Sequence, residues 1–250
     1  PIGTTPAEAI QSRGPIGPAD VFYTSDDRTL LCYPHIKEYD PVANDNVLAP
    51  YSQHLCGLSA QVQSQLGLQY SPSNKEILGI TGVEISLSSD FTDPDSEANL
   101  LNEVGICTIY RGFGTGSRAW GNRTAAWPVS TYVSTFFAVQ AVSDMIAETL
   151  EFNSLQFVDQ PLTIGLIDSI VKSVRAFLGR MKNQGLILDG QCWFEADDND
   201  QTQLSAGWIR FRVDQQPPPP AERITYEQRY NIGYLADLAE EAAAAYGRAA

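Results

Sequence analysis

The sequence predicts an α+β fold, with a mixed β-sheet packed with two long helices and an extended C-terminal arm strand. Three observations support this class. Apolar residues recur at helical spacing in two long stretches, 131–158 and 163–183. Shorter apolar or alternating runs lie before, between and after these stretches. Residues 223–234 alternate between an apolar and a polar face along their whole length.

Length and composition indicate a folded chain without a membrane span. The 250 residues are 43% hydrophobic and 18% charged, which is typical of globular proteins. No apolar run reaches the roughly 18 residues that a transmembrane helix needs. The first residues lack a basic segment followed by an apolar one, so no secretion signal is expected. The chain begins with Pro1 rather than Met, which suggests a fragment of a longer protein.

The net charge and the cysteines limit the classes of partner and the cellular compartment that are expected. With 30 acidic and 16 basic residues, the formal charge is −14, and such a chain repels phosphate backbones. A nucleic-acid partner is therefore not expected. The four cysteines are far apart and form no C-x-x-C pair, so we expect reduced, mostly buried thiols in a cytosolic compartment.

The elements follow one another in a simple order. A loop at 1–20 precedes an α+β core domain at 21–214, a Pro-rich linker at 215–222, an arm strand at 223–235 and a tail at 236–250. Within the first half of the core, we expect strands at 29–34, 83–87 and 106–110 and helices at 50–66 and 97–105.

Two helices and a change of period mark the second half of the core. The helix at 163–183 places six residues on one face: Ile167, Ile170, Val174, Phe177, Leu178 and Met181. After Gly185 the period becomes two, which predicts two further strands, one at Cys192 and Phe194 and another from Ile209 to Val213.

The arm strand has the most distinctive pattern in the chain. One face carries Ile224, Tyr226, Gln228, Tyr230, Ile232 and Tyr234, and the other is polar. At about 3.3 Å per residue the strand would span roughly 40 Å. Four prolines, 217–220, form a stiff spacer before it. The strand could fold back as an edge of its own domain, or it could join the sheet of another molecule.

Several segments resemble one family in the same order. Residues 105–125, GICTIYRGFGTGSRAWGNRTA, resemble the signature of contractile bacteriophage tail sheath proteins, the Mu-like members in particular. The signature residues are Gly112, Gly114, Trp120, Gly121, Asn122, Arg123 and Thr124. Matching segments also lie at 29–37, 50–60, 71–74, 150–161, 185–194 and 217–227, so the resemblance covers about 21–235. It identifies the chain as the C-terminal part of a sheath protein.

This resemblance implies a structural subunit rather than an enzyme, with no cofactor or metal. Sheath subunits form stacked rings or helical strands around a tail tube, and contraction drives the tube through the target cell envelope. The implied partners are other copies of the chain, the tail tube protein, and baseplate and tail terminator proteins. The implied location is a virion assembled in the host cytoplasm. The family's N-terminal half and N-terminal arm are not recognisable here.

In this family, terminal arms extend the sheets of neighbouring subunits, which favours a partner sheet for the arm strand. The expected interface residues are Arg223, Ile224, Thr225, Tyr226, Glu227, Tyr230, Ile232 and Tyr234. A sheath from an R-type bacteriocin or another phage-derived injection system fits the same motifs equally well.

A basic strip on the second long helix could contact an acidic tube protein. Lys172, Arg175 and Lys182 are expected on the side opposite the apolar face. The alternative is an ordinary solvated helix face.

Signals for catalysis are weak. The glycines at 112–116 are not followed by a helix pattern, and two histidines, His35 and His54, cannot supply a metal triad. Two acidic loops, 90–97 and 197–200, keep a hydrolase as an alternative, although solvated turns are the simpler interpretation.

Overall fold

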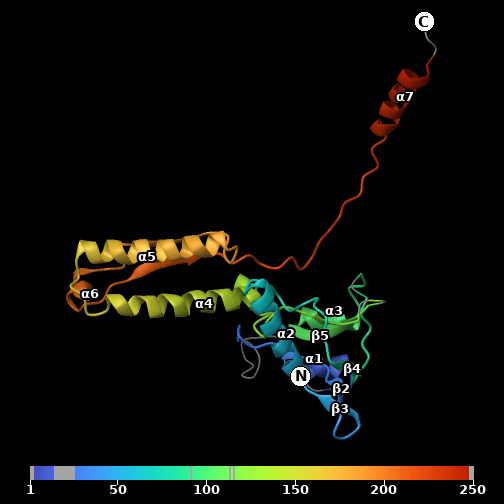
Figure 1. The fold of residues 1–250 in the computed structure, drawn as a ribbon, viewed down its shortest axis with the longest axis horizontal. Coiled ribbons are helices and arrows are strands. Elements are labelled where there is room, and N and C mark those ends of the chain that lie inside the picture. Colours follow the sequence, from blue (N-terminus) through green and yellow to red (C-terminus); the bar gives the residue numbers. More distant parts are fainter. Residues whose placement is uncertain (1–2, 14–25, 91, 113, 115, 248–250) are drawn as a thin grey trace. The chain divides into compact units, whose positions relative to one another are not determined.

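The computed structural model describes residues 3–13, 26–90, 92–112, 114 and 116–247. Parts of the predicted N-terminal loop, at 1–2 and 14–20, lie outside the described residues. The chain divides into two units, Pro1–Pro220 and Ala221–Ala250. Figure 1 shows the order of the elements along the chain. The mixture of helices and small sheets confirms the predicted α+β class.

The first sheet of the larger unit has strand β5 at its centre. Its order is β1 (Leu31–Cys32), β5 (Ile106–Arg111) and β6 (Ser117–Trp120), with β1 parallel and β6 antiparallel to β5. Because side chains alternate along a strand, β5 serves two cores. Ile106 packs in a cluster with Leu101 of α3 (Glu97–Glu103). Ile109 packs in another with Leu55 of α2 (Tyr51–Leu66).

The second sheet lies next to α2 in sequence and shares its core. Its order is β3 (Asp45–Ala49), β2 (Ile36–Asp40) and β4 (Ile80–Val83), all antiparallel. Ile36 and Ala49 join the cluster that contains Ile109. The β2–β3 hairpin was not predicted, because charged and polar residues interrupt both strands. The strand expected at 83–87 instead lies at Ile80–Val83, so the two overlap only at Val83.

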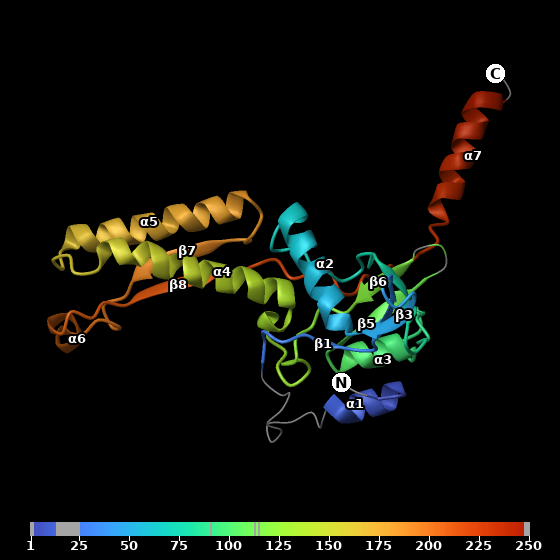
Figure 2. The ribbon, with the colours of Figure 1, turned by 60° about the horizontal axis from the view of Figure 1, so that its bottom comes forward.

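The predicted long helices are confirmed, and they form a separate layer with a two-stranded sheet (Figure 2). The helices are α4 (Phe137–Ser154) and α5 (Ile164–Asn183), flanked by the short turns η1 (Val133–Thr135) and η2 (Leu155–Phe157). The hairpin consists of β7 (Gly190–Phe194) and β8 (Phe211–Gln215), joined through α6 (Gln201–Ser205). A third core of Val142, Ile146, Phe177, Leu178 and Ile187 holds this layer together.

Two predictions at the chain ends are corrected. Residues Pro6–Arg13 form helix α1 within the segment predicted as a loop, and Arg13 is buried. In the smaller unit, helix α7 (Gly233–Tyr246) begins before the predicted arm strand ends, so Tyr234 is helical. The residues 223–231 are drawn out but have no strand assignment. Strand assignment requires a ladder partner, which the pattern of a single segment cannot supply.

Candidate assembly interface

The signature segment attaches the first sheet to the start of α4. Arg123 lies between two aromatic rings, 4.2 Å from the centroid of Trp127 and 3.5 Å from that of Phe136. Its Nη1 donates to Thr135 Oγ1 at 2.7 Å. The backbone N–H of Thr124 donates to Thr135 O at 2.8 Å. A cation held between two rings and hydrogen-bonded fixes the turn that leads into α4.

Gly121 allows this segment to approach β5 closely. Its φ is +121°, and a Cβ there would lie 3.0 Å from Cys107 Cα and 2.7 Å from Asn102 Oδ1. Both the backbone angle and the space therefore require glycine. The preceding residue, Trp120, contacts Tyr110 with tilted ring planes and ring centroids 5.3 Å apart. Asn122 contributes its carbonyl oxygen, which accepts from the N–H of Phe137 at 3.0 Å.

The other signature glycines, Gly112 and Gly114, lie in the turn between β5 and β6, and Gly114 has a φ of +71°.

Sequence reasoning missed a further residue that supports the signature segment. The buried Arg13 donates through Nη2 to the carbonyl oxygens of Ala125 at 3.1 Å and Trp127 at 2.6 Å. Desolvation lowers the pKa of its guanidinium. Only the helical pattern of α1, hidden among prolines and glycines, could have indicated its burial.

The residues of the predicted basic strip have partners within the unit. Lys172 pairs with Asp168 at 2.7 Å, one helical turn away. Arg175 does not face away from the core, since its Nε donates to the carbonyl oxygen of Cys192 on β7 at 2.7 Å. Lys182 pairs with Asp189, just before β7, at 3.0 Å. Helical spacing could not show where β7 would pack.

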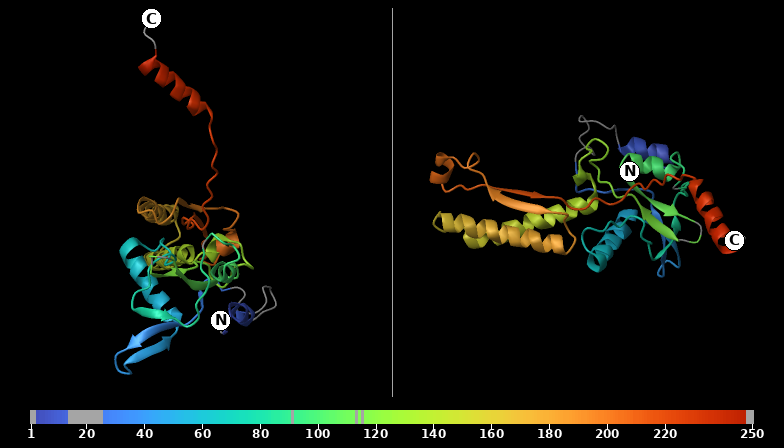
Figure 3. Two further views of the ribbon diagram at one scale, coloured as in Figure 1. Left: turned by 90° about the vertical axis from the view of Figure 1, so that its right-hand side faces the viewer. Right: turned by 90° about the horizontal axis from the view of Figure 1, so that it is seen from above.

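The β7–β8 hairpin offers edges to which another strand could be added. Within the described residues, the sheet contains these two strands only, so each has one edge outside the ladder. One backbone oxygen of β7 already accepts from Arg175, and this favours β8 as the free edge. Figure 3 shows the hairpin running alongside α5 in the view from above.

The arm residues expected at an interface are all exposed. Tyr226 is 84% exposed and Tyr230 is 100% exposed, while Ile224 and Ile232 are also largely open to solvent. Of the polar face, Arg223 and Thr225 are exposed, and Glu227 pairs with Arg229 at 2.7 Å. Exposed aromatic and β-branched side chains at alternate positions are unusual for a segment without a partner.

The acidic loops mainly support local turns and caps. Asp90 accepts from Thr92 N and Oγ1, and these hydrogen bonds lower the pKa of its carboxyl group. Asp200 caps α6 by accepting from Gln203 N at 2.7 Å. Arg212 lowers the pKa of Asp198. A general acid needs a raised pKa, so Asp90 and Asp198 do not fit that role.

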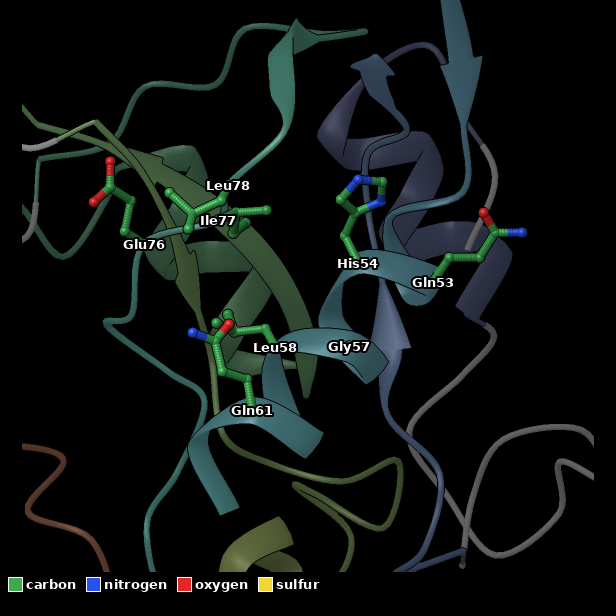
Figure 4. A pocket seen from close by; sticks show the side chains of 8 residues that line it. All are labelled: Gln53, His54, Gly57, Leu58, Gln61, Glu76, Ile77 and Leu78. Carbon is green, nitrogen blue, oxygen red and sulfur yellow. The ribbon is translucent and has the colours of Figure 1, made fainter. Parts of the chain in front are cut away.

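A hollow of about 320 Å³ lies between α2 and the segment 76–78 (Figure 4). Its lining residues are Gln53, His54, Gly57, Leu58, Gln61, Glu76, Ile77 and Leu78. None of these belongs to the acidic loops. His54 instead points to Glu38, with 3.5 Å between Nε2 and Oε2, and His35 pairs with Glu84 at 3.0 Å.

Among the described residues, no group of three or more His, Cys, Asp or Glu side chains could hold a metal ion. No helix in the same residues combines the length and the apolar character needed to cross a bilayer.

Comparisons with known proteins agree on one family. Residues 4–125 match the phage tail sheath protein central domain. The tail sheath protein of Burkholderia phage BcepMu is 44% identical over 238 residues, which is 95% of this chain and 50% of the relative. The tail sheath protein of Escherichia phage P2 is 33% identical and covers 84% of this chain and 52% of its own length. The chain thus spans about half the length of these relatives.

Solved structures share the fold. The sheath complex of an extracellular contractile injection system, PVC, in its contracted state aligns with a TM-score of 0.75 at 17% identity, covering 93% of this chain and 62% of its own. The helical sheath of the anti-feeding prophage, also contracted, aligns with a TM-score of 0.73 at 16% identity, covering 87% and 59%. The curated relatives are structural sheath proteins.

Proposed function

This chain belongs to the phage tail sheath family, and we propose that it is a structural subunit of a contractile tail sheath. It polymerises around a tail tube, and contraction of the polymer drives the tube through the target cell envelope. It acts without catalysis, in a virion assembled in the bacterial host cytoplasm. The observation that carries the proposal is the exposed, alternating arm segment at 223–231.

The arm supplies the link between subunits. Added beside β8 of a neighbour, which has 5 residues, it would form about five backbone hydrogen bonds, each contributing about 0.5–1.5 kcal/mol. The apolar side chains Ile224, Tyr226 and Tyr230, which are exposed in a single chain, would then be buried against the neighbour. Self-association is supported by the neighbours of this fold, which are sheath and baseplate assemblies.

Contraction requires two packings of the same subunits and links that survive the change between them. The proline spacer 217–220 and the arm provide such a link, because they connect two folded bodies through the backbone alone. Interfaces between the folded units can then repack while the β-pairing of the arm stays intact.

Further partners are the tail tube protein, the baseplate and the tail terminator. For the tube, Lys172 is the strongest of the predicted contact residues, since its side chain is 73% exposed, against 50% for Lys182, and Arg175 reaches back to β7. A sheath of an R-type bacteriocin or another phage-derived injection system is the second candidate. The similarity in fold to the sheath of an extracellular contractile injection system supports this second candidate.

Cryo-electron microscopy of the full-length protein, co-expressed with its tube protein, tests the proposal. We expect striated tubes in which residues 223–231 pair with the sheet of a second copy. Particles in which that segment lies entirely on its own subunit would contradict the proposed link. Failure to form any polymer would contradict the proposed function.

A further inference from the structure

The connection between α4 and α5 is an exposed apolar surface, which we call the tip. Between residues 152 and 164 the only charged side chain is Asp159. Five large apolar side chains there are exposed: Phe152, Leu155, Val158, Leu162 and Ile164. A solvated turn is normally polar, so five exposed large apolar side chains in one connection indicate a protein contact.

Helix α7 carries a second exposed apolar surface, which we call the stripe. At 100° per residue, four positions fall on one side of the helix: Leu235, Leu238, Ala242 and Tyr246. Of its three acidic residues, Asp237 and Glu240 fall on the opposite side, and Glu241 flanks the stripe next to Leu238. Leu235 is 65% and Leu238 60% exposed. The helix is therefore amphipathic without a covered apolar side.

The direction of β8 connects these two surfaces. Along α5, Lys182 contacts Asp189 and Arg175 contacts Cys192, so β7 runs toward the N-terminus of α5, where the tip lies. Strand β8 is antiparallel to β7 and runs away from the tip. An arm that pairs antiparallel with β8, the slightly more stable arrangement, runs toward the tip and carries α7 there.

The lengths are compatible. The arm segment 223–231 is longer than β8, which has 5 residues, so it extends past β8 by about 13 Å at about 3.3 Å per residue. From Arg175 to Ile164 the axis of α5 rises about 16 Å, and the 14 residues of α7 span about 21 Å.

We propose that α7 of one subunit docks its stripe on the tip of the subunit whose β8 its arm pairs with. This inference rests on the proposed function, and it assigns a partner surface to the C-terminal helix. One donor chain then holds its acceptor at two places, through backbone pairing at β8 and through side-chain burial at the tip. The acidic side of α7 stays in solvent.

Crosslinking in assembled polymers tests the docking. In full-length protein carrying Cys56→Ser, the pair Leu238→Cys and Leu155→Cys should be joined between subunits by a short bismaleimide. The matched control pair, Ala244→Cys and Leu155→Cys, places the thiol on the acidic side of α7 and should give several-fold less product.

The outcomes separate the two proposals. Polymers with equal crosslinking in both pairs would overturn the docking and leave the sheath function standing. Crosslinking of Leu238→Cys alone, without the tip cysteine, would show that α7 pairs with another α7 and would also overturn it. Absence of polymers would overturn both.

A polymerisation assay gives a second readout. Leu238→Asp should raise the critical concentration by about tenfold, because it prevents burial of one leucine at the contact. The control Ala244→Asp adds the same charge to the same helix and should leave the critical concentration unchanged. In the double variant Leu238→Asp and Leu155→Asp, the loss of polymerisation free energy should be smaller than the sum of the two single losses, since both substitutions remove the same contact. Equal effects of Leu238→Asp and Ala244→Asp, or additive ones in the double variant, would overturn the docking.

Discussion

Strand β5 and the arm segment 223–231 have similar sequences but different surroundings. Both are rich in isoleucine and tyrosine, with polar residues between them. In β5, strands pair on both sides and two cores cover the faces, so Ile106 and Ile109 are almost completely buried. In the arm, Ile224 and Tyr226 remain exposed. The comparison teaches that residue propensity favours an extended strand, whereas stabilisation comes only where strands and side chains are available to pair with it and cover it.

The largest expected effect is on assembly. Deleting residues 223–250 removes the arm and α7, and we expect polymerisation to be lost while the thermal unfolding of the remaining unit is unchanged. Sedimentation and electron microscopy measure the first, and calorimetry the second. Tyr226→Phe, which keeps the ring and the backbone, is the control and should polymerise normally. An unfolded deletion variant would show that the arm also stabilises its own subunit.

A matched pair of alanine substitutions tests the same contrast in stability. Ile109→Ala in β5 should lower the free energy of unfolding by about 2–5 kcal/mol, because it leaves a cavity in a packed core. Ile224→Ala in the arm should change the stability of the isolated subunit by less than about 0.5 kcal/mol. Urea denaturation measures both. Comparable losses would mean that the two segments do not differ as described.

The signature arginine should have an intermediate effect. Replacing Arg123 by Met keeps the length of the side chain but removes the stacked cation and the hydrogen bond to Thr135. We expect a loss of about 1–3 kcal/mol in unfolding free energy. Arg118→Met on the neighbouring strand serves as the comparison, because its partner atoms lie on Asn74 in a more exposed loop. An Arg123→Met variant as stable as the native chain would contradict this role.

The smallest effect at neutral pH concerns the cysteines. Burial raises the pKa of Cys32 to about 12 and also raises that of Cys107. Since both thiols are neutral when folded but ionise more readily in the unfolded chain, stability should be unaffected below pH 9 and fall between about pH 9 and 12.

Urea denaturation between pH 8 and 12 measures this fall, and thiol labelling at pH 8 checks the burial on which it depends. The exposed Cys56 should react first. The thiolate is the reactive form of cysteine, and burial of the other three thiols disfavours their ionisation. Rapid labelling of Cys107 in the folded protein would contradict the burial. Of the four thiols, which were expected to be mostly buried, Cys107 and Cys192 are buried, Cys32 is half-buried and Cys56 is exposed. No pattern in the sequence marks the exposure of Cys56 on α2.

Elements with their own strong period were predictable. Helices α4 and α5 have continuous apolar faces, and β5 is a short buried run between two glycines. Elements whose stability comes from neighbours were not. The β2–β3 hairpin alternates poorly, and α1 lies in a segment rich in proline and glycine. Tertiary contacts override weak local signals at such sites.

The candidate interface shows the same limit. The arm was identified by its alternation, but Ile232 and Tyr234 fit both a strand and the first turn of a helix. The alanine-, leucine- and glutamate-rich residues that follow favour helix, which explains why α7 begins at Gly233. For the basic strip, sequence spacing gave the helix face but not the position of β7 against it.

One consequence follows from the arm and the β8 edge being different surfaces of one chain. A contact between unlike surfaces is not used up when two copies pair, so each added copy leaves a new acceptor or donor open, and growth continues unless the rotation between copies closes a ring. A copy truncated before residue 221 would still offer its β8 edge to the arm of a neighbour, but it would have no arm to donate to the next copy. Small amounts of such copies, mixed with intact ones, would act as chain terminators and shorten the polymers in proportion to their share.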